Sequence, residues 1–89
     1  MLPNKVMEYL VKNVDFKNVP AKSLIKNYKL LSFIHESNIT TEKLISIIYY
    51  NPETINYIET DKFNFKTQEL IGLLVAHPDL MNFFKINYE

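Results

Sequence analysis

The chain of 89 residues contains no cysteine, no arginine and a single glycine, Gly72. Without cysteine the protein has no disulfide, no thiolate zinc site and no thiol nucleophile. One glycine is too few for a loop that cradles phosphate groups. Lysine supplies every basic side chain, and lysine cannot make the planar, two-pronged contact with phosphate or guanine that arginine makes.

Long apolar runs are also missing. The longest, residues 70–76, has seven residues, whereas a membrane-spanning helix needs about 20. The first residues do not form a charged segment followed by an apolar one, so we expect no signal peptide and a cytoplasmic protein.

The composition indicates one folded domain, 1–89. Ten basic and ten acidic side chains cancel, and 47% of the residues are hydrophobic, which argues against a disordered chain and against a strongly basic nucleic-acid-binding protein. The length is that of one domain. Asn, Lys, Ile, Tyr and Phe supply 42 residues, and their AT-rich codons favour an AT-rich genome such as that of a phage or another mobile element.

The second half of the chain contains an internal repeat with an offset of 26 residues, which aligns 38–63 with 64–89 without a gap. The identical pairs include Thr41 and Thr67, Leu44 and Leu70, and Pro52 and Pro78. Two apolar segments separated by one proline are typical of a helix-turn-helix unit that packs against a copy of itself. The sequence therefore predicts two tandem units, 38–63 and 64–89, after an N-terminal helical pair in residues 1–37.

Each unit is expected to begin a helix at its threonine and to break at its proline. Thr41 and Thr67 can cap the free amides of the first turn. Proline lacks an amide hydrogen and moves the preceding residue out of the helical region, so a second short helix is predicted from Pro52 and from Pro78. A kinked continuous helix is the alternative. Gly72 lies mid-helix, where glycine costs about 1 kcal/mol relative to alanine, so we expect a tight helix crossing there.

The first half shows no visible repeat. The spacing of apolar residues predicts one helix near residues 3–13 and a longer amphipathic helix over 20–36, separated by a polar turn at 15–18. No segment shows the sustained alternation of apolar and polar residues that is typical of a β-strand. We therefore predict an all-α fold, a compact bundle of four to six short helices.

Charge is unevenly distributed along the chain. Residues 1–35 carry six lysines and two acids, a net charge of +4, and residues 36–89 carry four lysines and eight acids, a net charge of −4. One side of the predicted long helix holds Lys22, Lys26, Lys29 and Phe33. The first interpretation of these lysines is a solvated outer face. The alternatives are contact with phosphate groups, with Phe33 stacking on a base, or contact with an acidic patch on another protein or on a second copy.

Aromatic residues are abundant, with six tyrosines and six phenylalanines. Packing in the core is their default role. A chain of this size, however, buries only about two-thirds of its surface, and aromatic residues are enriched at protein interfaces. The predicted partner-binding face consists of Tyr49, Tyr50, Tyr57 and Phe83.

Residues suited to catalysis are scarce. The two histidines, His35 and His77, lie 42 positions apart and form no metal-binding motif. We expect His35 to cap the negative end of a helix or to pack at its boundary. We expect His77, before Pro78, to occupy a turn or a capping position. We expect no enzymatic activity, no catalytic residue, no cofactor and no metal.

The functional hypothesis is a non-enzymatic protein-protein interaction module, a small phage or mobile-element protein that binds and modulates a host or viral protein. One alternative is a nucleic-acid-binding protein that uses the lysine face and acts as an oligomer. The other is a self-assembling structural component, a homo-oligomer in which the oppositely charged halves pair.

Overall fold

The structure, a computed structural model, describes residues 3–84. This range contains α-helices and 3-10 helices and no β-strand, so the prediction of a compact all-α fold is confirmed. The α-helices are α1 (Asn4–Asn13), α2 (Ala21–Ile25), α3 (Thr41–Tyr50) and α4 (Thr67–Ala76). The 3-10 helices are η1 (Phe16–Asn18), η2 (Tyr28–Phe33), η3 (Glu36–Asn38), η4 (Pro52–Tyr57), η5 (Thr60–Lys62) and η6 (Pro78–Phe83).

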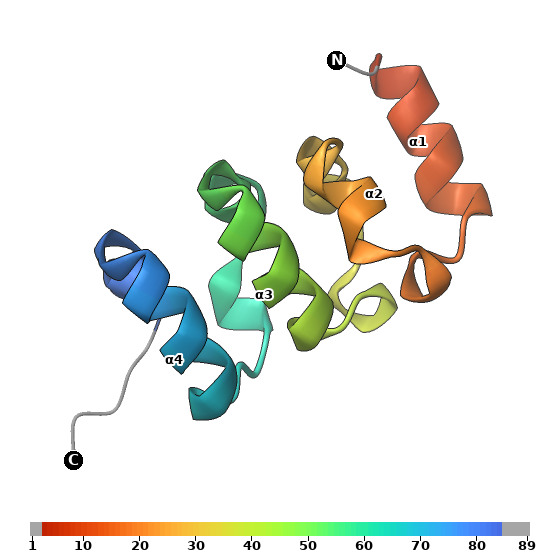
Figure 1. Cartoon of the computed structure of the whole chain (residues 1–89). Coiled ribbons are helices and arrows are strands. Elements are labelled where there is room, and N and C mark those ends of the chain that lie inside the picture. Colours follow the sequence, from red (N-terminus) through yellow and green to blue (C-terminus); the bar gives the residue numbers. More distant parts are fainter. Residues whose placement is uncertain (1–2, 85–89) are drawn as a thin grey trace.

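The helices form a stack along the long axis of the molecule, whose principal extents are 44 × 23 × 19 Å (Figure 1). Helices α2, α3 and α4 lie side by side, and each is followed by a 3-10 helix of six residues. Of these 3-10 helices, η2 packs against η4. Helix α1 packs against η2 at the N-terminal end. None of the helices within residues 3–84 has the length and apolar character needed to cross a membrane.

Two prolines end the long helices, as the sequence predicts. The residues before them, Asn51 and His77, have φ/ψ angles of −143°/87° and −135°/71°, which are outside the helical region. Pro52 and Pro78 then start η4 and η6. The kinked continuous helix is therefore wrong, and the second segment of each unit is a tighter 3-10 helix.

The predictions that Thr41 and Thr67 cap their helices are wrong, because Thr40 and Lys66 occupy the N-cap positions of α3 and α4. Thr40 caps α3, because its side chain accepts a hydrogen bond from the backbone N–H of Lys43 at 3.2 Å. Thr41 is already helical, and its hydroxyl donates instead to both carboxylate oxygens of Glu69, at 2.9 and 3.1 Å. Glu69 also accepts from the backbone N–H of Lys66 at 2.8 Å, so one carboxylate starts α4 and holds it against α3.

The long helix predicted over residues 20–36 is wrong. The chain divides there into α2 and η2, and Asn27, which separates them, has φ/ψ angles of −117°/37°. The Asn27 side-chain amide donates to the carbonyl of Ser23 at 3.2 Å. A short polar side chain that hydrogen-bonds the backbone in this way competes with helix propagation. The lysines and Phe33 therefore do not lie on one continuous helix.

The same order of elements occurs three times in the described chain, as η1–α2–η2, η3–α3–η4 and η5–α4–η6. We call these the first, middle and last units. Helix α2 has five residues where α3 and α4 have ten, and η2 begins four residues earlier relative to its α-helix. Four residues are close to one turn, so the same sides of the helices still face the core. A sequence duplication of 38–63 and 64–89 stays a prediction.

The core consists of two clusters that meet at α3. Leu44 and Ile47 belong to the cluster around α1, α2 and η2, and Ile48 belongs to the cluster around α4 and η6. All three side chains are fully buried. Equivalent positions are buried in each unit. They are the fourth residue of the α-helix and the third residue of the 3-10 helix that follows it. These residues are Leu24, Leu44 and Leu70, and Leu30, Thr54 and Leu80.

The tight helix crossing predicted at Gly72 is absent. Gly72 is exposed, and a Cβ atom added to it would meet no atom within 4 Å. The fold itself therefore does not require a glycine at this position.

Candidate interaction surface

Tyr49 and Tyr50 stand at the C-terminal end of α3, beside an open groove between α3 and α4. Tyr50 is 70% exposed, and the two rings meet edge to face with their centroids 5.0 Å apart. The groove has a volume of about 260 Å³ and is lined by Ile45, Ser46, Tyr49, Tyr50, Glu69, Gly72 and Leu73. We call this region the α3–α4 groove. Because Gly72 has no side chain, the backbone of α4 is accessible in the groove.

His77 fixes the end of this surface. Its Nε2 lies 2.8 Å from the carbonyl oxygen of Tyr49, and because a carbonyl oxygen only accepts, Nε2 must donate. The imidazole ring also meets the Tyr49 ring edge to face at 5.9 Å. The predicted turn position of His77 is confirmed, and this side chain in addition joins α4 to α3.

The other predicted aromatic residues lie elsewhere. Tyr57 is half-buried at the end of η4, where its ring meets that of Tyr28 at 5.3 Å and the ammonium of Lys29 at 5.7 Å. The Tyr28 hydroxyl donates to Glu53 at 2.8 Å, and this hydrogen bond, followed by burial and the carboxylate charge, raises the pKa of Tyr28. Tyr57 therefore helps to join η2 to η4. Phe83 is exposed at the end of η6, and its carbonyl accepts from the Thr60 hydroxyl at 2.6 Å.

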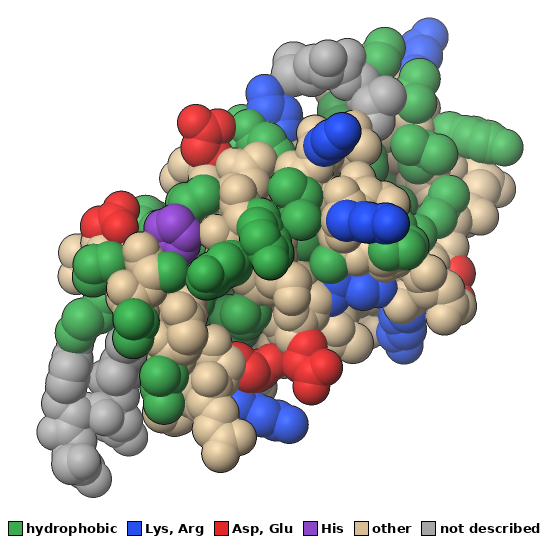
Figure 2. Space-filling model, viewed as in Figure 1, with side chains coloured by type: hydrophobic (Ala, Val, Ile, Leu, Met, Phe, Trp, Pro, Cys, Tyr) green, Lys and Arg blue, Asp and Glu red, His purple; other side chains and the backbone are tan. Residues whose placement is uncertain are grey.

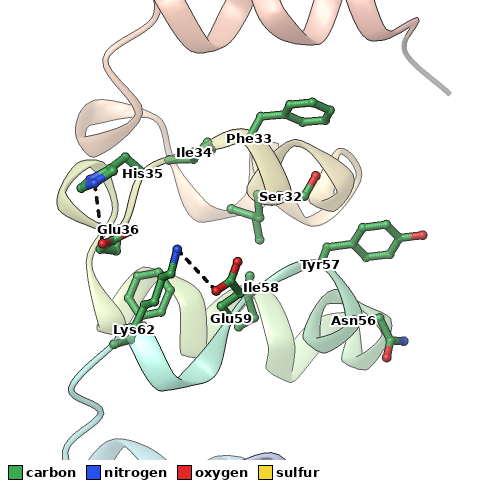
Figure 3. A pocket seen from close by; sticks show the side chains of 12 residues that line it. Ser32, Phe33, Ile34, His35, Glu36, Asn56, Tyr57, Ile58, Glu59 and Lys62 are labelled. Atoms are coloured by element: carbon green, nitrogen blue, oxygen red, sulfur yellow. Dashed lines mark ion pairs between the residues drawn. The ribbon is translucent and has the colours of Figure 1, made fainter.

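A second hollow, of about 440 Å³, lies between η2–η3 and η4–η5 (Figure 3). Phe33 and Tyr57, the last residues of η2 and η4, extend to the same side of it in Figure 3. Two side-chain pairs lie along the hollow: the ion pair of Lys62 with Glu59 at 3.4 Å, and the imidazole of His35 with the carboxylate of Glu36 at 3.6 Å. All four side chains are at least one-third exposed, so these pairs contribute little to stability.

The predicted lysine stripe is split by the helix break. Lys22 and Lys26 are exposed on and just after α2, whereas Lys29 is half-buried on η2 and faces the ring of Tyr57. Phe33 is exposed at the end of η2, beside the second hollow. Figure 2 shows lysines gathered over the N-terminal part of the molecule in this view.

His35 occupies a different helix end from the one predicted. It precedes η3, and its Nδ1 accepts a hydrogen bond from the backbone N–H of Ser37 at 3.1 Å. It therefore caps the positive end of a short helix rather than the negative end of a long one. Within residues 3–84 no three His, Asp or Glu side chains gather closely enough to hold a metal ion.

Several exposed apolar side chains were not predicted from the sequence, and three of them lie near one another in the chain. Ile71 and Val75 lie on the outer side of α4, and Met81 lies on η6. In a stack of helical units each unit contacts only its neighbours, so a side of α4 that faces none of the described units stays exposed.

Comparisons with protein-family models, with curated proteins and with solved structures found no match to this chain. Tyr49 and Tyr50 offer aromatic faces and hydroxyls beside an accessible helix backbone, a combination that suits the binding of a polypeptide.

Proposed function

We propose that this chain is a non-enzymatic protein-interaction module that binds a protein partner at the α3–α4 groove. The observation that carries the proposal is the 70% exposure of Tyr50 beside Tyr49 and the groove. Contiguous exposed apolar surface on a small protein marks an interaction site more often than it marks an accident of packing.

Three properties of the groove favour a protein as the partner. Tyrosine supplies a large contact area with few rotatable bonds, and tyrosine is enriched among residues that dominate binding energy. His77 holds the carbonyl of Tyr49, so part of the surface is already ordered before binding. Gly72 leaves the α4 backbone accessible, which allows a partner's main chain to approach closely.

Composition supports one biological setting for this proposal. A small AT-rich gene product that binds a protein surface fits a phage or mobile-element protein that modulates a host or viral protein by occupying that surface. In this setting the module works by covering a functional surface of its partner.

The matched pair of variants Tyr50→Ser and Tyr9→Ser tests the proposal. Both remove an exposed tyrosine, from the groove and from α1 respectively. Full-length protein is immobilised and exposed to extract of the host cell, and captured proteins are quantified. We expect a captured protein whose yield falls about tenfold or more with Tyr50→Ser, as for a residue that dominates an interface, and is unchanged with Tyr9→Ser. Equal capture by all three forms, or none above background, would overturn the proposal.

A further inference from the structure

We propose that the end of the stack formed by α4 and η6 is covered by the N-terminal end of a second copy of this chain, so that copies associate head to tail. We call the outer side of α4 and η6 the open end; its exposed apolar residues are Ile71, Val75, Met81 and Phe83. This surface is distinct from the α3–α4 groove, so the inference does not depend on the proposed function.

The open end has the character of an interior surface. Ile55 on η4 and Met81 on η6 occupy equivalent positions, yet Ile55 is 5% exposed and Met81 is 38% exposed. Likewise Ile45 on α3 is half-buried against the cluster around α4, whereas its counterpart Ile71 is exposed. In the middle unit the next unit covers these positions. In the last unit none of the described residues does.

A recurring hydrogen bond points the same way. The side-chain amide of Asn51 donates to the carbonyl of Ile25 at 3.2 Å, and Nε2 of His77 donates to the carbonyl of Tyr49 at 2.8 Å. In each case the residue that follows one α-helix reaches back to the last turn of the previous α-helix. Val75 holds the corresponding place on α4, and it is 79% exposed. The next helical unit in such a stack would reach this carbonyl.

The opposite end of the molecule also exposes apolar side chains. Val6 and Tyr9 lie one turn apart on α1, and both are exposed. Of the nine large hydrophobic side chains that are most exposed in the described chain, six belong to α1, α4 or η6. Figure 2 shows hydrophobic side chains at both ends of the elongated body. Apolar exposure is therefore concentrated where two copies would meet end to end.

Charge selects the head-to-tail arrangement over a symmetric one. Residues 1–35 carry a net charge of +4 and residues 36–89 a net charge of −4. Two open ends facing each other would bring like-charged halves together, whereas the open end against α1 brings opposite charges together. An open head-to-tail assembly keeps one free end of each kind, so further copies can add and the mass should grow with concentration.

A mixing experiment with two end variants tests this arrangement. Val75→Glu places a charge on the open end, and Tyr9→Glu places one on α1. Mass is measured by light scattering over a hundredfold range of concentration at low salt. The mass of the wild-type protein should rise above 10.5 kDa. Each variant alone should stay a monomer, because every contact between two of its copies would need the blocked end. An equimolar mixture should give a dimer, because each variant keeps one working end.

Controls separate lost assembly from lost folding. Asn56→Glu adds the same charge at an exposed position of the middle unit and should behave as wild type, as should Tyr50→Ser. Ile71→Glu and Val6→Glu are second variants of the two ends, used if either first variant loses helicity by circular dichroism. Three results would overturn the proposal: a wild type that stays monomeric throughout, a dimer of Tyr9→Glu alone, or a mixture that stays monomeric.

Discussion

Thr54 is the clearest residue-scale departure from the pattern of this core. It is fully buried, its hydroxyl has no hydrogen-bond partner in the described part of the chain, and leucine holds its place in the other two units, as Leu30 and Leu80. A buried hydroxyl without a partner has lost its hydration and gained nothing in return.

Replacing this hydroxyl with a methyl group should therefore stabilise the protein. We expect Thr54→Val, which keeps the side-chain shape, to raise the free energy of unfolding by about 1 kcal/mol, measured by urea denaturation. Thr67→Val, at an exposed position, should change it by less than about 0.5 kcal/mol. A loss of stability in Thr54→Val alone would show that the hydroxyl has a partner after all.

Tyr28 makes the stability of the folded protein depend on pH. Its pKa is raised above the ordinary 10.0, first by its hydrogen bond to Glu53, then by burial and by the carboxylate charge. The unfolded chain therefore loses this proton at a lower pH than the folded chain does. The stabilisation is complete below pH 10.0 and is lost as the pH rises through the folded-state pKa.

A titration of the tyrosines, followed by the ultraviolet absorbance of tyrosinate, checks the raised pKa of Tyr28. The difference between wild type and Tyr28→Phe isolates one tyrosine, which should ionise above pH 10.0. Glu53→Gln should lower that pKa toward 10.0, because the carboxylate charge and the strong acceptor are both removed. Glu59→Gln changes a carboxylate outside this contact and should leave the pKa of Tyr28 unchanged. A Tyr28 that titrates at its ordinary value in wild type would contradict the contact.

At the scale of elements, the side chains that follow α3 and α4 join one unit to the one before. Asn51 and His77 use different chemistry, an amide and an imidazole, for the same donation to a carbonyl in the last turn of the previous helix. Each bond satisfies a carbonyl that the helix end would otherwise leave to water. These residues therefore end one helix and also connect it to the previous unit.

The joint at His77 can be tested by substitution. His77→Ala should lower the free energy of unfolding by about 1 kcal/mol, since it removes one hydrogen bond and its ring contact with Tyr49. His77→Gln, whose amide nitrogen reaches about as far as Nε2, should recover most of this loss. Thermal and chemical unfolding measure both. Equal destabilisation by the two variants would mean that packing of the ring, and not the donated hydrogen bond, holds α4 to α3.

The elements that could be predicted were those set by local chemistry. The breaks at Pro52 and Pro78 were predictable because proline acts on the residue beside it. The break at Asn27 was missed because an apolar spacing of helical type continues across it, while the competing side-chain bond to Ser23 is visible only in the structure. The first unit could not be matched to the other two by an alignment without gaps, because α2 is shorter than α3 and α4 by about one turn.

The candidate site was predicted in part for the same reason. Tyr49 and Tyr50 lie together because they are neighbours in one helix, and α4 completes their groove. Tyr57 follows Pro52 into η4, so it faces Tyr28 and Lys29 instead. Periodicity within one helix says nothing about which neighbour covers which side. The exposure of Ile71, Val75 and Met81 could therefore be recognised only once the structure showed which units are neighbours.

At the scale of the whole molecule, the protein is a short stack with two different ends. One end is α1, which exposes Val6 and Tyr9 among polar side chains, and the other is the apolar open end. Arrays of this kind gain stability from contacts between neighbouring units, and they require a polar end to stay soluble. An apolar end on such a stack is a surface that another helical unit completes.

The mass of the wild-type protein in solution, followed over a hundredfold range of concentration at low and high salt, tests this account most directly. Head-to-tail association predicts a mass that rises above 10.5 kDa with concentration and falls back at high salt, because opposite charges bring the two ends together. Val75→Glu should remain at 10.5 kDa under all conditions. A wild type that remains at that mass throughout would contradict the account.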